Sequence, residues 1–212
     1  MIIGRWEVMK MDPTKDRAFG EMLQVARARL SARPAEAVAA GAGIEFDAGS
    51  SAFVLSSLGQ TLRISYPGYE ISPEIDKWHQ LTLLHYLDMA DGASITSRLI
   101  PFGDLPHGLI RGGGFDRQSE RTISQKLACL APDLLRAACV GLGASIVPSN
   151  ADLCAVFPFL PRYPVTLKIW FADEDIPGAG RLFLDGSAAH YLSVEDAVTV
   201  GTLILDRLLS LL

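Results

Sequence analysis

Carboxylate side chains in the last part of the chain are the residues best suited to chemistry. An acidic run at residues 173–175 follows one apolar segment, and Asp185 follows the next. Glu195 and Asp196 stand at the start of a helical pattern, with His190 a few residues before them. Carboxylate oxygens are the ligands that hard divalent cations prefer. Asp185, Glu195 and Asp196 are therefore a candidate metal set.

The same carboxylates also have a structural interpretation. Ser193 with Asp196 three residues later resembles a capping box, and acidic side chains in a first helical turn complement the helix dipole. Residues 173–175 are also typical of a solvated turn. If the two preceding strands pair as a hairpin, this turn lies at one end and Asp185 at the other, which separates the carboxylates into two groups.

A glycine run flanked by arginines is the second candidate site. Arg111 precedes the glycines at 112–114, and Arg117 and Arg121 follow them, ahead of a helix predicted from residue 119. Successive glycines before a helix can present backbone N–H groups to an anion. The order matches neither a Walker loop nor a dinucleotide fingerprint, and a flexible turn is the alternative interpretation.

Histidines and aromatic side chains complete the candidate set. His79 and His85 lie about 240° apart around a helix, so they cannot chelate one metal together. His85 falls on an apolar stripe and is expected to be a hydrogen-bonded core residue. His107 lies in a Pro-His-Gly turn, where it is free to contact a ligand. The predicted ligand-binding residues are Phe102, His107, Arg111, Gly113, Asp185, His190 and Tyr191.

The composition is that of one soluble globular domain. Hydrophobic residues make up 49% and charged residues 20% of the 212 residues. This balance is typical of a chain that buries a core without metals or disulfides. The net charge of −5 argues against a nucleic-acid partner, because phosphate binding requires a basic surface.

Three cysteines, Cys129, Cys139 and Cys154, are scattered and lack any C-x-x-C spacing. No iron–sulfur cluster or structural zinc is therefore expected. Unclustered thiols fit a reducing compartment. The N-terminal residues lack the apolar core of a signal peptide, and no apolar run approaches the ~18 residues that a membrane span requires. A cytoplasmic protein with no membrane partner is predicted.

Hydrophobic periodicity predicts strands in runs, separated by blocks of helices. The predicted helices are residues 13–33, 34–40, 73–90, 119–130, 132–142 and 193–212. The predicted strands are residues 44–46, 52–58, 61–66, 153–157, 165–171 and 181–184. The stretch 91–115 is predicted to be rich in loops. The fold class is α+β, with a mainly antiparallel sheet, a buried central helix at 73–90 and a long amphipathic C-terminal helix.

The C-terminal helix has the clearest periodic signal. Its apolar positions fall within about 80° on a helical wheel. Gly201 lies within this stripe, so we expect another element to approach the helix closely there. The stripe consists of Val194, Ala197, Val198, Gly201, Leu205, Leu208 and Leu212.

Two motifs resemble one known family. The pattern W-x-x-D-E-x-x-P begins at Trp170, and L-F-D-x-S-A-x-x-Y-L-x-x-E-D begins at Leu182, with Leu184 inserted before Asp185. They resemble the domain of unknown function 3786, a family found mainly in anaerobic bacteria and archaea. The resemblance implies that residues 12–212 form one domain, after a poorly defined segment at 1–11. Some relatives carry an N-terminal iron–sulfur segment whose cysteines this chain lacks, and the family implies no activity.

Three function classes remain. The leading hypothesis is a protein of anaerobic metabolism that binds a small anionic or metal-associated ligand, where residues 102–115 meet residues 185–196. The competing class is a non-enzymatic interaction module, as a homo-oligomer or on a larger complex, which an exposed C-terminal helix would favour. The third class is an enzyme that uses a carboxylate-bound metal.

Overall fold

The computed structural model describes residues 13–212. Its helices are α1 (Pro13–Ser31), α2 (Ala35–Ala42), α3 (Lys77–Met89), α4 (Gly108–Lys126), α5 (Pro132–Gly141) and α6 (Val194–Leu211). Its strands are β1 (Glu45–Asp47), β2 (Ala52–Ser57), β3 (Gln60–Ser65), β4 (Ile71–Ser72), β5 (Leu99–Ile100), β6 (Ser145–Ile146), β7 (Leu153–Leu160), β8 (Tyr163–Trp170) and β9 (Ala179–Asp185). Short 3-10 turns occur at Phe102–Asp104 and Ala188–His190.

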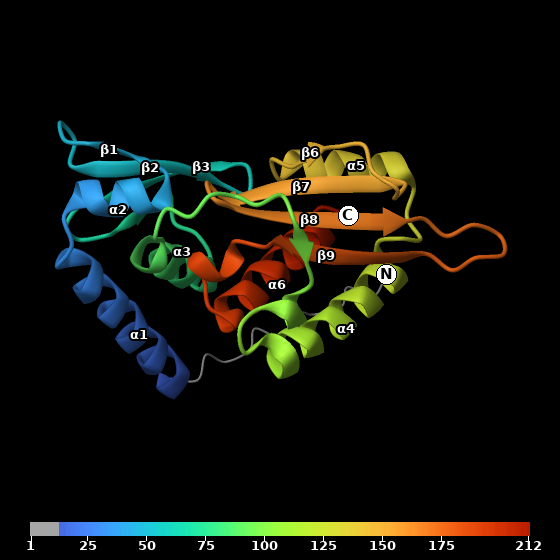
Figure 1. Ribbon diagram of the computed structural model, residues 1–212, viewed down its shortest axis with the longest axis horizontal. Helices are drawn as coiled ribbons and strands as arrows, with labels where there is room; N and C mark the ends of the chain where they lie inside the picture. The colour runs from blue at the N-terminus through green and yellow to red at the C-terminus, as the bar shows by residue number, and fades with distance from the viewer. Residues whose placement is uncertain (1–12) are drawn as a thin grey trace, which may run out of the picture.

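The strands form two antiparallel sheets that lie nearly end to end (Figure 1). The first sheet has the order β1-β2-β3-β4, and the second has the order β5-β9-β8-β7-β6. The helices α3, α6 and α4 lie together on one side of the sheets, where α6 packs against both of the others. The fold is therefore α+β with antiparallel sheets and a long C-terminal helix, as predicted.

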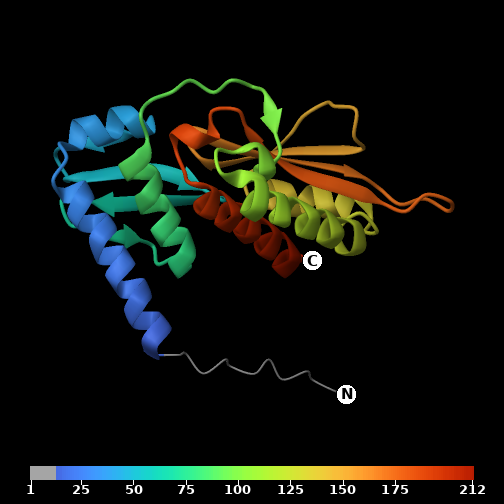
Figure 2. The ribbon, with the colours of Figure 1, turned by 60° about the horizontal axis from the view of Figure 1, so that its bottom comes forward.

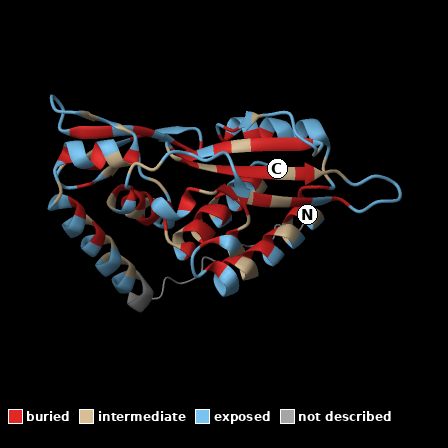
Figure 3. Ribbon diagram, viewed as in Figure 1, coloured by how far each residue is buried: buried red, intermediate tan, exposed pale blue. Residues whose placement is uncertain are grey.

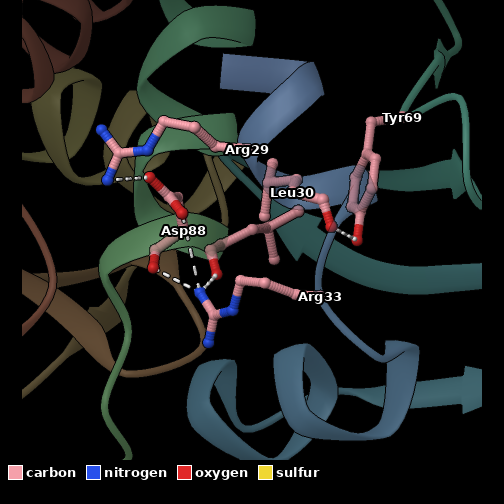
Figure 4. Close-up of polar contacts among 6 residues, drawn as sticks. Arg29, Leu30, Arg33, Tyr69 and Asp88 are labelled. Carbon is pink, nitrogen blue, oxygen red and sulfur yellow. Dashed lines mark hydrogen bonds and ion pairs between the residues drawn. The ribbon is translucent and has the colours of Figure 1, made fainter. Parts of the chain in front are cut away.

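Helix α1 is joined to the C-terminal end of α3 by a polar network (Figure 4). The Asp88 carboxylate lies 2.8 Å from Arg29 Nη2, and the Arg33 guanidinium donates to the carbonyl oxygens of Leu87 and Asp88. An arginine on the last carbonyls of a helix satisfies acceptors that have no partner within the helix. The Tyr69 hydroxyl donates to Leu30 O at 3.3 Å, which ties the first sheet to α1.

The predicted central helix is buried on several sides, but it begins four residues later than the pattern suggested. Leu83, Leu84 and Leu87 are fully buried in α3. The helix starts at Lys77 because the Asp76 carboxylate accepts from the next backbone amides and caps it. Residues 73–76, which the pattern predicted to be helical, instead form an irregular connection between the short strand β4 and Lys77.

Helix α6 confirms its predicted cap and its predicted stripe up to Leu208, whereas Leu212 lies past the end of the helix and is exposed. The Ser193 hydroxyl accepts from the Asp196 amide, and the inward-facing side chains of α6 are buried along most of its length (Figure 3). A Cβ atom at Gly201 would lie 2.4 Å from the Phe115 ring, so this glycine permits the expected close approach. Within residues 13–212, no helix has the length and apolarity to cross a membrane.

The glycine run lies inside helix α4, which corrects the prediction of a loop. The helix begins at Gly108, and Gly112–Gly114 form its second turn rather than an anion-binding nest. A Cβ atom at Gly112 would lie 2.2 Å from Phe102 O. The glycines therefore let α4 pack directly on the backbone of the 3-10 turn at Phe102–Asp104. The buried Asp116 carboxylate of α4 also accepts from the backbone amides of Phe102 and Gly103.

Candidate functional site

Three of the predicted ligand-binding residues have structural roles. Phe102 and Tyr191 are fully buried. Phe102 packs against Phe115 with ring centroids 4.6 Å apart, and Tyr191 stacks on Tyr86. Gly113 lies within α4, where an added Cβ atom would meet only Arg117 Nη1, at 3.8 Å. None of these three positions presents a side chain to a ligand.

His107, Arg111 and Asp185 line three separate cavities. Arg111 lines a hollow between α4 and α6, and Asp185 lines a groove on the second sheet. His107 and Glu195 line a pocket of about 390 Å³ at the predicted junction of residues 102–115 and 185–196, but the rest of that lining is mostly apolar. The structure therefore does not gather the predicted ligand residues into one site.

The predicted metal carboxylates are also dispersed. Asp196 Oδ1 lies 2.7 Å from His85 Nδ1, and its Oδ2 accepts from the Ser193 hydroxyl. Asp185 binds other partners, and among residues 13–212 no three His, Cys, Asp or Glu side chains are grouped to hold a metal ion. Asp196 instead orders the start of α6 and joins it to α3. The hydrogen bond to Asp196 raises the pKa of His85, because it favours the protonated imidazole.

We expect Asp196→Asn to lower the pKa of His85 and to destabilise the protein by about 1–2 kcal/mol. A raised folded-state pKa gives stability that is present in full below the ordinary histidine pKa of 6.5 and is lost as pH rises through the raised value. The stability difference between the proteins should therefore be larger in mild acid than in alkali. NMR titration of His85 and urea unfolding measure both effects, and an unchanged His85 pKa would contradict the assignment.

The most developed candidate site is a groove on the face of the second sheet opposite α4 and α6, called the outer-face groove here. Its volume is about 440 Å³, which lies within the usual range for small-ligand sites. Residues of the connection from α3 to β5 line one side of the groove, and residues of the connection from β6 to β7 line the other. Both connections run above the second sheet in Figure 2. The lining residues are Ile95, Ser97, Leu99, Val147, Pro148, Ser149, Cys154, Val156, Pro164, Thr166, Lys168 and Asp185.

Asp185 lies at one end of this groove and is held by four hydrogen bonds. Its Oδ1 accepts from the backbone amides and the hydroxyls of Thr96 and Ser187 at 2.7–2.9 Å. Burial opposes ionisation of Asp185, but the hydrogen bonds from Ser187 and Thr96 outweigh it and hold the pKa of the carboxyl below its usual value. Asp185 is therefore a carboxylate at neutral pH, although it is only 3% exposed.

All four donors bind one oxygen of Asp185, and the other oxygen, Oδ2, has no hydrogen-bond partner among the described residues. The neighbouring Thr166 lines the same groove and is 5% exposed. Its hydroxyl has no hydrogen-bond partner among the described residues. Val156 and Pro164 complete the groove surface around them. Neither Oδ2 nor the Thr166 hydroxyl oxygen is among the fully buried side-chain atoms of the described residues that lack a partner, so both are open to solvent, and a polar ligand atom or water can bind them there.

The opposite end of the groove contains Lys168 and Cys154, which are directly paired across β8 and β7. Lys168 Nζ donates to Asn150 Oδ1 at 3.1 Å, which uses one of its three N–H groups. Lys168 is the only basic residue in the groove lining. This end therefore offers positive charge and hydrogen-bond donors.

His190 and Tyr191 stabilise the wall of the groove. The connection that follows α3 is fastened by His190 Nδ1, 2.7 Å from Asp91 Oδ2, and by the Tyr191 hydroxyl, which donates to Ala93 O. Thr96 of the same connection donates to Asp185. These two predicted ligand residues therefore lie near the groove but act on its wall.

Sequence patterns contained only part of the signal for this groove. The alternation of Val165, Leu167 and Ile169 with Thr166 and Lys168 predicts that the last two share a face of the strand. The two connections that form the walls are distant in the sequence, and no local pattern places them over that face.

The fold and the groove define an α+β protein whose second sheet is covered by helices on one face and carries the outer-face groove on the other. The chain belongs to the family described as Domain of unknown function (DUF3786), whose family model matches residues 34–207. The matched segment contains every residue that lines the outer-face groove. No curated protein and no solved structure matches the chain.

Proposed function

We propose that the protein binds a small, mostly apolar ligand in the outer-face groove, with a hydrogen-bond donor of the ligand on Asp185. The observation that carries this proposal is that Asp185, an ionised carboxylate, lines the groove and its Oδ2 receives no hydrogen bond from the described residues. Oδ2 is not among the fully buried atoms without a partner, so a ligand donor can reach it. The chain fills only the acceptor positions of Oδ1, so a donor at Oδ2 gains a charge-assisted hydrogen bond.

Exposed apolar side chains on the rim support the apolar part of the ligand. Ile95, Leu99 and Val147 are exposed large hydrophobic residues, and all three line the groove. Covering them removes apolar surface from water, which contributes about 25 cal/mol per Å². The proposal keeps the small-ligand function predicted from the sequence and moves its site to the outer face of the second sheet.

The free cysteines support a reducing compartment, and we propose the cytoplasm. Cys129, Cys139 and Cys154 are unpaired. Disulfides would be expected to form and persist more readily in an oxidising compartment.

A fluorescent probe tests the proposal directly. 1-Anilinonaphthalene-8-sulfonate has an apolar ring system, an N–H donor and an acidic group, and we expect it to bind the folded protein at a saturable site. Val156→Trp fills the groove and should weaken this binding at least tenfold. Val54→Trp is the matched control, because Val54 is an exposed valine on β2 of the other sheet.

Thiol labelling gives a second readout of the same experiment. Bound probe should slow the reaction of N-ethylmaleimide with Cys154, which lines the groove, and leave the exposed Cys129 unaffected. Equal probe affinity of the Val156→Trp and Val54→Trp proteins would overturn the proposal, as would the absence of saturable binding.

An interaction module is the second candidate function. Leu109 and Ile110, at the start of α4, are 83% and 86% exposed, and adjacent exposed apolar residues are typical of protein contacts. The C-terminal helix gives weaker support than the sequence suggested, because Leu208 is fully buried and the exposed large apolar residues of this segment are only the last two, Leu211 and Leu212. Absence of ligand binding in the groove would favour this class.

A further inference from the structure

We infer that the ligand of the outer-face groove is bipolar, with an acidic group at Lys168 and a hydrogen-bond donor, such as an amine or hydroxyl, at Asp185. This inference rests on the proposed function and specifies the chemical class of the ligand. It follows from the positions of the two charged residues among the groove lining, which is otherwise uncharged.

The strand register fixes the distance between the two ends. Val165 pairs with Leu184 in the antiparallel ladder, so Asp185 lies one residue beyond this pair and Lys168 lies three residues away in the other direction. Four residues of extended strand span about 13 Å. The ligand must therefore be elongated, with its polar groups at its two ends.

The Asp185 end selects a donor. Oδ2 can only accept, because the carboxylate is ionised, and the Thr166 hydroxyl beside it can both donate and accept. Thr166 lies opposite Phe183 in the register, two residues before Asp185 on β9. Diagonal positions of this kind are neighbours on one face of a sheet. A protonated amine or a hydroxyl suits this pair, whereas a second carboxylate would be repelled.

The Lys168 end selects an acid. Asn150 holds the ammonium group through one N–H, and the remaining N–H groups can donate to a carboxylate, sulfonate or phosphate. Asp185 is the only acidic residue in the lining, and it stands at the far end. A purely apolar molecule would cover both charged groups without pairing them, so it should bind more weakly than a bipolar molecule.

Straight-chain probes separate the two ends of the groove. 12-Aminododecanoic acid carries both groups on a flexible chain that is long enough to reach both charged residues, and dodecanoic acid and dodecylamine each carry one. We expect the bipolar probe to bind at least tenfold more tightly than either of the others in isothermal titration calorimetry. The much shorter 3-aminopropanoic acid should not show measurable binding, because it cannot reach both ends and covers little apolar surface.

Two substitutions assign the ends. Lys168→Met keeps the apolar stem of the side chain and should weaken binding of both acids without affecting dodecylamine. Asp185→Asn should weaken binding of both amines, and Thr166→Val is a second variant for that end because it leaves the hydrogen bonds of Asp185 Oδ1 intact. Circular dichroism and thermal unfolding of each variant verify that it folds.

The outcomes distinguish this inference from the proposed function. If Val156→Trp abolishes binding of the fluorescent probe, the groove binds ligands. The bipolar class is still wrong if 12-aminododecanoic acid then binds no more tightly than the probes with one polar group. It is also wrong if Lys168→Met and Thr166→Val leave all probe affinities unchanged. If none of the probes binds at a saturable site, both proposals are wrong. A tenfold advantage lost in the matching variants supports both.

Discussion

Gly112→Ala should destabilise the protein by about 3 kcal/mol, whereas Gly114→Ala, two residues later in the same helix, should stabilise it by up to about 1 kcal/mol. A Cβ atom at Gly112 would lie 2.2 Å from the oxygen and 2.5 Å from the carbon of the Phe102 carbonyl. These are backbone atoms, so relief requires movement of the whole 3-10 turn or of α4.

The environment of Gly114 accounts for the opposite sign. A Cβ atom there would have no other atom within 4 Å, so alanine adds no clash. Alanine in a helix interior is favoured over glycine by roughly 0.8–1 kcal/mol, because glycine loses more backbone entropy on folding. Urea unfolding of the two variants measures both effects. Equal free energies of unfolding would show that α4 does not pack on Phe102 as described.

Acid should destabilise the protein through His79, by about 2–3 kcal/mol between neutral pH and about pH 4.5. Burial lowers the pKa of His79 to about 4, and the positive charge of Arg207 acts in the same direction. The unfolded chain takes up a proton near the ordinary value of 6.5, whereas the folded protein resists protonation until pH falls to about 4. Stability from this group is therefore lost as pH falls through that window.

The contacts of His79 explain why it stays neutral. The Ser57 hydroxyl donates to Phe159 O at 2.6 Å, so it must accept from Nε2–H of His79, 2.8 Å away. Both residues are at most 2% exposed, and Nδ1 has no acceptor among the described residues. This buried serine–histidine pair joins α3, β2 and β7.

Unfolding free energies measured between neutral and acid pH test this assignment, with His79→Gln as the variant. Glutamine can donate to Ser57 and does not titrate, so the variant should lose less stability on acidification than the natural protein. The difference between the two curves isolates His79 from His85 and the carboxylates, which titrate in both proteins. Parallel curves would rule out His79 as the source of the acid sensitivity.

Local patterns predicted the elements that depend on neighbouring residues. The apolar stripe of α6, its Ser193 cap and the hairpin of β8 and β9 all follow from periodicity and short-range chemistry. The strand pattern placed residues 173–175 and Asp185 at opposite ends of this hairpin before any tertiary contact was known.

Helix α4 shows where local propensity failed. Glycines in a helix interior are unfavourable in isolation, so the pattern at residues 112–114 predicted a loop. The segment is nevertheless helical, and Gly112 lets this helix pack directly on the backbone of Phe102, where any larger side chain would collide. This contact is made by the 3-10 turn at Phe102–Asp104, which is a separate element of the fold. A rule based on helical spacing within α4 therefore does not include it.

The amino-acid sequence by itself determined which segments are helices or strands at most positions, which of their faces are apolar, and the absence of clustered thiols, because these properties depend on residues a few positions apart. Only the tertiary structure decided that Asp196 binds His85, 111 positions away, and that Asp185 presents one free oxygen to an apolar groove. Those outcomes depend on burial and on partners that chain folding brings together from distant segments. The physical reason is that periodicity reports how exposed a face is, whereas the partner of a polar group is set by long-range packing.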